Sequence, residues 1–80
     1  MEPSARIREF IEREILVDAG IASVEVDTPL LRGLIDSLGL MQLVLFLEED
    51  FGITIDDTEV VPDHFRTVGT ISRLVELKIR

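Results

Sequence analysis

Apolar residues recur at the spacing of an amphipathic helix in three segments of the chain, and this pattern predicts an all-α fold. The first segment is expected to begin at Ser4 as N-cap and to run to about Asp18, with Gly20 ending it. Its apolar positions are Ile7, Phe10, Ile11 and Ile15. The last segment follows Thr67 as cap, and its apolar positions are Val68, Ile71, Leu74 and Val75.

The middle segment predicts a helix from Ser37 to Asp50 or Phe51, capped by Asp36 or Ser37 and ended by Gly52. A step of about 100° per residue gathers one set of apolar residues into a core-facing stripe. This set is Leu40, Leu43, Val44, Leu47 and Phe51. A second set lies on an arc centred about 140° away. It consists of Leu38, Met41 and Leu45.

A domain of this size is not expected to bury every side of one helix, so the second arc should be partly exposed. Glu48 and Glu49 lie beside it, and Gln42 marks the solvent side. An exposed apolar patch bordered by acids indicates a protein-docking site. The alternative is that the long preceding connection covers these residues as ordinary core.

The connections are unequal in length. Residues 20–36 form a long connection broken by Thr28, Pro29 and Gly33. Its apolar residues should pack on the core: Ile21, Val24, Val26, Leu30, Leu31 and Leu34. Residues 53–55 alternate like a strand but have no partner strand, so an extended loop is expected. One short helical turn, begun by Pro62, should follow before Phe65. We therefore predict three main helices and a short third helix in a single domain over residues 1–80.

Charge is concentrated in the middle of the chain. The 80 residues hold 8 Lys and Arg against 16 Asp and Glu, a net charge of −8. Residues 33–65 contain eight of the acids and no base, so the remainder is neutral. This segment is either a solvated face or a recognition surface for a basic partner protein. The charge argues against nucleic-acid binding and against an anionic membrane surface.

The chain has no cysteine, which excludes a disulfide scaffold, a Cys-ligated zinc site and thiol catalysis. No signal peptide is visible, and the longest central stretch without charge, Ser37 to Leu47, is too short to span a bilayer. We expect a cytoplasmic, monomeric protein.

Ser37 stands where the long connection meets a helix N-terminus. It is either a plain N-cap residue or a hydroxyl placed for covalent modification, because a phosphate at a helix N-terminus lies in favourable electrostatics. A serine hydrolase is not expected: a G-x-S-x-G elbow would need glycine where Ile35 stands, and the single histidine, His64, makes no triad.

No metal site is expected. The acids at Asp56, Asp57, Glu59 and Asp63 lack the spacing of a calcium loop. No catalytic constellation is found either, so an enzyme is not expected.

Two motifs resemble the acyl carrier and peptidyl carrier protein family. Asp36-Ser37-Leu38 opens the middle helix, and Leu47-Glu48-Glu49-Asp50-Phe51-Gly52-Ile53 closes it. The similarity extends upstream to Thr28-Pro29-Leu30-Leu31 and downstream to Phe65-Arg66-Thr67-Val68, and so covers nearly the whole chain.

The resemblance implies a four-helix bundle with Ser37 as the attachment point of 4′-phosphopantetheine. A phosphopantetheinyl transferase would install this group from coenzyme A, and its thiol would carry acyl or aminoacyl groups as thioesters to partner enzymes. Carried over by position, the partner-binding residues are Asp36, Leu38, Met41, Leu45, Glu48 and Glu49. The carrier itself would catalyse nothing.

The sequence departs from the family pattern at Gly39 and Gln42, where carriers of fatty acid synthesis often have acids. This favours a stand-alone carrier in a dedicated biosynthetic pathway, loaded by an acyl or aminoacyl ligase, over housekeeping fatty acid synthesis. The sequence leaves open whether the cargo is a fatty acyl group, a polyketide or an amino acid for nonribosomal peptide synthesis. A second hypothesis is a small acidic helical adaptor that docks a basic protein without a covalent cofactor.

Overall fold

A computed structural model of the chain describes residues 3–16 and 24–79. Four α-helices occur in this part: α1 (Pro3–Phe10), α2 (Ser37–Phe51), α3 (Pro62–Phe65) and α4 (Val68–Ile79). A π-helical segment, η1 (Ile11–Ile15), continues α1, and a 3-10 turn, η2 (Asp57–Glu59), precedes α3. No strand occurs among the described residues, which confirms the all-helical prediction.

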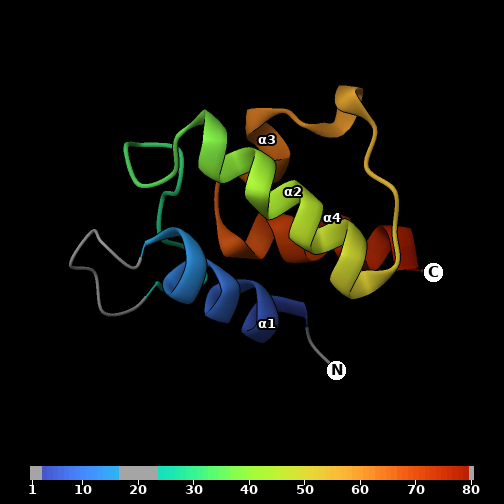
Figure 1. The fold of residues 1–80 in the computed structure, drawn as a ribbon, viewed down its shortest axis with the longest axis horizontal. Helices are drawn as coiled ribbons and strands as arrows, with labels where there is room; N and C mark the ends of the chain where they lie inside the picture. The colour runs from blue at the N-terminus through green and yellow to red at the C-terminus, as the bar shows by residue number, and fades with distance from the viewer. Residues whose placement is uncertain (1–2, 17–23, 80) are drawn as a thin grey trace.

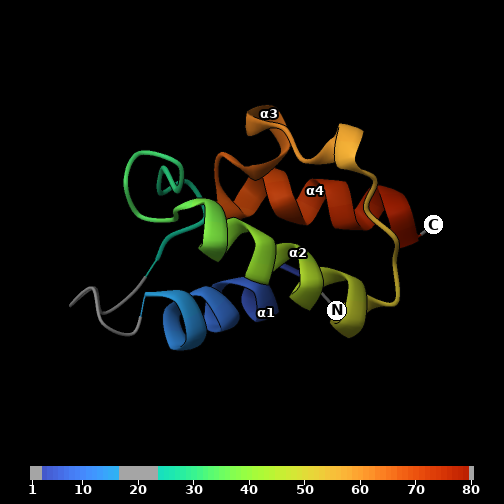
Figure 2. The same ribbon diagram turned by 45° about the horizontal axis from the view of Figure 1, so that its top comes forward.

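The helices pack against one another (Figures 1 and 2), and their buried side chains form one apolar core. Helix α4 contacts α1, α2 and α3, and α2 also contacts α1. The fully buried members of the core come from every helix and from the connection before α2. They include Ile7, Ile11, Val24, Leu30, Leu43, Leu47, Phe65, Ile71 and Val75. Burial of these side chains is the main force that holds such short helices together.

The first helix differs from the prediction at its start. Helix α1 begins at Pro3, so Ser4 lies inside its first turn and the predicted N-cap is wrong. Proline is well suited to the first turn, because its missing N–H would have no intrahelical partner there. The predicted end at Asp18 and Gly20 lies outside the described residues.

The second half of this helix is wider than an α-helix. The backbone N–H of Leu16 donates to the carbonyl of Ile11 at 2.9 Å, a bond across five residues. The widened turn keeps Ile11 fully buried and leaves Ile15 half-buried. A π-turn within an α-helix is rare and is often found beside a functional site.

The connection before α2 packs on the core only in part. Val24 and Leu30 are fully buried and Leu34 is partly buried, as predicted. Val26 and Leu31 are exposed, which corrects the prediction for these two residues; Ile21 lies outside the described part. Val26 is held by its backbone instead, since its carbonyl accepts the N–H of Gly69 at 3.0 Å.

Helix α2 begins and ends at the predicted residues. The carboxylate of Asp36 caps it, and Gly52 ends it in the left-handed conformation at φ +66°, which glycine adopts without strain. Residues 53–56 form a loop with no strand, in agreement with the loop expected for residues 53–55.

The turns that follow are partly as predicted. Pro62 is the first residue of α3, in agreement with the sequence. The turn η2 was not anticipated; it is closed by a capping box between Asp56 and Glu59. Thr67 caps α4 as predicted, because its Oγ1 accepts the N–H of Thr70 at 3.2 Å.

Candidate functional site

The candidate attachment residue, Ser37, is the first residue of α2 and is exposed. The preceding residue makes the cap: Asp36 Oδ1 accepts the N–H of Gly39 at 2.8 Å, and the Asp36 carbonyl accepts the N–H of Leu40 at 2.9 Å. Of the two readings of Ser37, the plain N-cap is therefore wrong. The Ser37 hydroxyl does not cap the N-terminus of α2, and Ser37 is exposed to solvent.

The backbone around Ser37 favours an attached anion. A helix N-terminus leaves its first N–H groups without intrahelical partners, and its dipole is positive there. Asp36 takes the N–H of Gly39 but not those of Ser37 and Leu38, and no side chain of a described residue accepts these two. A phosphodiester on the serine oxygen would meet both groups at close range.

The first turn of α2 is closely packed on its inner side. Gly39 is buried, and a Cβ at this position would lie 3.1 Å from Ile35 Cγ2 and 3.3 Å from both Asp36 Oδ1 and Ile15 Cγ2. The absence of a side chain thus lets η1 approach α2 directly behind Ser37. Apart from the glycine itself, nothing in the sequence indicates this contact.

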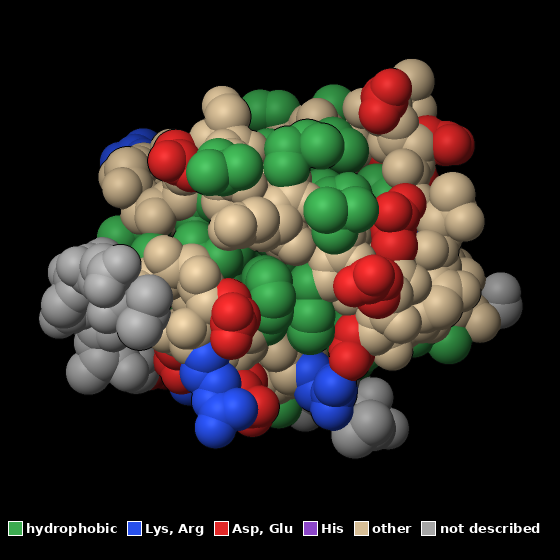
Figure 3. All heavy atoms as spheres, viewed as in Figure 1, with side chains coloured by type: hydrophobic (Ala, Val, Ile, Leu, Met, Phe, Trp, Pro, Cys, Tyr) green, Lys and Arg blue, Asp and Glu red, His purple; other side chains and the backbone are tan. Residues whose placement is uncertain are grey.

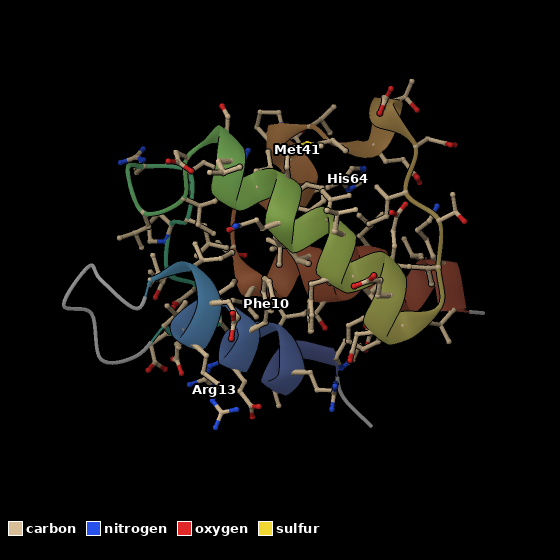
Figure 4. All side chains as sticks on the ribbon, in the orientation of Figure 1. Phe10, Arg13, Met41 and His64 are labelled. Carbon is tan, nitrogen blue, oxygen red and sulfur yellow. The ribbon has the colours of Figure 1, made fainter. Side chains whose placement is uncertain are left out.

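The second apolar arc of α2 faces solvent, which confirms the predicted exposure. Leu38 is 68% exposed, Met41 57% and Leu45 55%. In the space-filling view, hydrophobic side chains gather over α2 and acids border them (Figure 3). Met41 lies on the side of α2 toward α3, whereas Phe10 lies on the opposite side, between α1 and α2 (Figure 4). The alternative, in which the long connection covers the arc as ordinary core, is therefore wrong.

The core stripe of α2 is also as predicted. Leu43 and Leu47 are fully buried and Val44 is 7% exposed. Leu40 and Phe51 are partly buried against the same core.

The acidic residues of the candidate docking face differ in their exposure and in whether their carboxylates already accept a hydrogen bond within the chain. Glu49 is exposed. Glu48 is only half-exposed, and its Oε2 accepts the backbone N–H of Ile55 at 2.9 Å, which fastens the loop after α2. The carboxylate of Asp36 is engaged by Gly39. The structure thus gives Glu48 and Asp36 local structural roles in addition to their predicted contact with a partner.

Among the described residues, the two groups with a displaced pKa, Arg6 and Glu59, lie away from Ser37. The pKa of Arg6 is raised, first by its hydrogen bond to Asp50 on α2 and then by the charge of that carboxylate. The pKa of Glu59 is lowered, first by the hydrogen bond from Lys78 and then by that from the backbone of Asp56. Both pairs join elements that are distant in sequence, and they indicate structural ion pairs.

Other predicted features can be placed in the same structure. His64 lies in the short helix α3, half-exposed and near Glu59. Within residues 3–16 and 24–79, no three acids or histidines are grouped so as to hold a metal ion. In the same ranges, no helix has the length and apolar character needed to cross a membrane.

Comparison with known proteins agrees with this geometry. The sequence profile of a family described as "phosphopantetheine attachment site" matches residues 5–75. A D-alanyl carrier protein of Bacillus velezensis is 43% identical over 48 residues, which is 59% of this chain. The matched region spans 62% of that relative's length.

A solved structure is also similar. Its title is "Crystal structure of FAD-dependent dehydrogenase", and the matching chain superimposes with a TM-score of 0.77 at 31% identity. The match covers 86% of this chain and 97% of the solved chain. The two chains are therefore close to each other in length.

Proposed function

Because this chain belongs to the acyl or peptidyl carrier protein family, whose members bear covalently attached 4′-phosphopantetheine, we propose that Ser37 is its attachment point. In this proposal the protein is a four-helix carrier that presents thioester-bound substrates to partner enzymes and has no catalytic activity of its own. One observation carries the assignment of the residue: Ser37 is exposed as the first residue of α2, while Asp36 takes over the cap.

The residues around Ser37 fit the group chemically. The serine oxygen would form the new bond to phosphorus as the pyrophosphate bond of coenzyme A breaks, with release of the adenosine bisphosphate and of the hydroxyl proton. The free N–H groups at the start of α2 stabilise the negative charge of the resulting phosphodiester. The attached arm supplies a thiol, which a chain without cysteine does not otherwise have.

The proposed docking face is the exposed arc of α2 with its acidic border. Leu38, Met41 and Leu45 supply apolar contact area, and Glu49 supplies an unengaged charge for basic partners. Asp36 and Glu48 complete the surface. The partners in this proposal are a phosphopantetheinyl transferase, a loading ligase and downstream transferases, and the protein acts as a cytoplasmic monomer.

The cargo that we propose is an amino acid or a small acyl group in a dedicated pathway. Two comparisons support this choice: one relative is a D-alanyl carrier protein, and the similar solved structure is titled an FAD-dependent dehydrogenase. The solved structure suggests that the tethered group is oxidised by a flavin enzyme. The flavin would accept a hydride from the tethered group while a base takes a proton from it. Intact mass of the protein purified from its native host tests this, because an aminoacyl or short acyl adduct is expected and a long fatty acyl adduct contradicts it.

The attachment itself is tested by mass. The purified chain, a broad-specificity phosphopantetheinyl transferase, coenzyme A and Mg²⁺ should give a protein heavier by one phosphopantetheinyl group. Ser37→Ala should gain nothing, whereas Ser72→Ala, the same change within α4, should load like the wild type. Absence of a gain in the wild type, or a gain in Ser37→Ala, would falsify the proposal and leave the adaptor hypothesis.

A further inference from the structure

The two positions at which the sequence departs from the family pattern lie in one hollow beside Ser37. This hollow, of about 260 Å³, is lined by both Gly39 and Gln42. Its other walls are Ile15 of η1, Gly33 and Leu34 of the preceding connection, and Asp36 and Leu38. Ser37 thus lies in the chain between two residues that line the hollow.

The hollow depends on what Gly39 and Gln42 lack. A Cβ at Gly39 would lie 3.1 Å from Ile35 and 3.3 Å from Asp36 and Ile15, so a side chain here would push apart Ile15 and Asp36, two of the walls of the hollow. An acid at position 42 would add a second carboxylate to a hollow that already contains that of Asp36. With glycine and a neutral amide in these places, the hollow is open and carries less negative charge, so that a phosphodiester nearby is repelled less.

The lining matches the part of a phosphopantetheine arm nearest the serine. That part consists of a phosphate, a branched carbon with two methyl groups, a hydroxyl and an amide. Ile15 and Leu34 offer apolar surface, and the amide of Gln42 can both donate and accept a hydrogen bond. Gln42 lies five residues after Ser37, or about 7.5 Å further along the helix axis, a span that the phosphate and the branched unit can cover.

Resting on the proposed attachment at Ser37, we propose that this hollow holds the first part of the arm. The two methyl groups pack on Ile15 and Leu34, and the first amide bonds to Gln42. The arm then leaves the hollow on the α1 side of α2, away from the face that carries Met41 and Leu45. Met41 and Leu45 are therefore left clear for partner enzymes while the arm is held, whereas Asp36 and Leu38 belong to both the docking face and the hollow.

Nuclear magnetic resonance of the holo protein tests this placement. The chain is labelled with ¹³C and ¹⁵N, loaded with an unlabelled arm, and its loading is confirmed first by intact mass. We expect nuclear Overhauser contacts from the two arm methyl groups to the side chains of Ile15 and Leu34, and shifts in the Gly39 amide and the Gln42 side-chain amide relative to the apo protein. Contacts to Met41 or Leu45 instead, or no contacts at all in a fully loaded sample, overturn the proposal.

Two matched variants separate the hollow from a general charge effect. Gln42→Glu adds a carboxylate to the hollow, and the arm contacts to Ile15 and Leu34 should be lost. Leu77→Glu adds the same charge on the exposed side of α4, outside both the hollow and the docking face, and those contacts should persist. Equal contacts in the two variants would contradict the role of Gln42. A failure of the wild type to load contradicts the proposed function itself, which keeps the two outcomes distinct.

Discussion

Asp36 accepts the N–H of Gly39 at 2.8 Å, and this bond holds the first turn of α2 on which Ser37 stands. Asp36 thus has two roles: it caps the helix, and its negative charge can attract a basic partner. Replacement by alanine would remove both roles together. Asparagine separates these roles, because its side-chain oxygen can cap the helix equally well without the charge.

We expect Asp36→Ala to lower the free energy of unfolding by about 1 kcal/mol, since it removes the cap. In a domain of this size that corresponds to a fall in Tm of roughly 4–8 °C. Asp36→Asn should melt close to the wild type. Thermal melting distinguishes them, and equal losses in both variants would show that the charge, not the cap, stabilises α2.

Met41 and Leu43 lie two residues apart on α2 but on different faces. Met41 is 57% exposed and Leu43 is fully buried. Met41→Glu should therefore leave Tm nearly unchanged while lowering kcat/KM for the transferase about tenfold, as expected for an apolar contact worth about 1.4 kcal/mol.

Leu43→Ala is the complementary variant. It should cost about 2–5 kcal/mol of stability by leaving a cavity. Unfolding of Met41→Glu would place Met41 in the core and contradict the assigned docking face.

The sequence predicted α2 well because its signals are local. Asp36 and Gly52 mark its ends, and the two apolar arcs follow from the helical repeat alone. The same reasoning missed η1, since five residues are too few to separate a widened turn from an α-turn. It also placed Val26 and Leu31 in the core, because composition cannot distinguish a connection held by its backbone from one held by its side chains.

The candidate site, too, was predicted from the sequence only in part. Ser37 and the exposed arc followed from sequence and resemblance. The hollow beside Ser37 did not, because it forms only when Ile15, far away in sequence, approaches Gly39. The turn η2 could have been found from Asp56-Asp57-Thr58-Glu59, which has the spacing of a capping box with aspartate in place of serine or threonine.

Phe10 of α1 and Phe46 of α2 stack with ring centroids 4.1 Å apart and planes 12° from parallel. Both are partly buried at the contact between the two helices. In a double-mutant cycle of Phe10→Leu and Phe46→Leu, we expect a coupling free energy of about 0.5–1.5 kcal/mol, measured by chemical denaturation.

The control cycle pairs Phe10→Leu with Phe65→Leu on α3. Phe65 is buried elsewhere in the core, so the effects should add within about 0.5 kcal/mol. Additivity in both cycles would mean that the stacked rings contribute only through their buried area.

The ion pair between Glu59 and Lys78 fastens η2 to the end of α4. Lys78 Nζ lies 2.8 Å from Glu59 Oε1, and this bond is the largest cause of the lowered pKa of Glu59. A carboxylate whose pKa is lower in the folded state than the ordinary 4.5 adds stability above that pH and loses it as the pH falls toward the folded value.

Glu59→Gln should therefore melt below the wild type at neutral pH, and the difference in Tm should shrink as the pH is lowered through about 4.5 toward the folded pKa. Glutamine can still accept the N–H of Asp56, so the difference reports the charge. Asp57→Asn makes the same change of net charge at the neighbouring exposed residue, and its difference from the wild type should not follow this course. If the Tm differences of the two variants from the wild type follow the same course with pH, the net charge of the acidic segment, and not the bond to Lys78, governs the stability of the contact between η2 and α4.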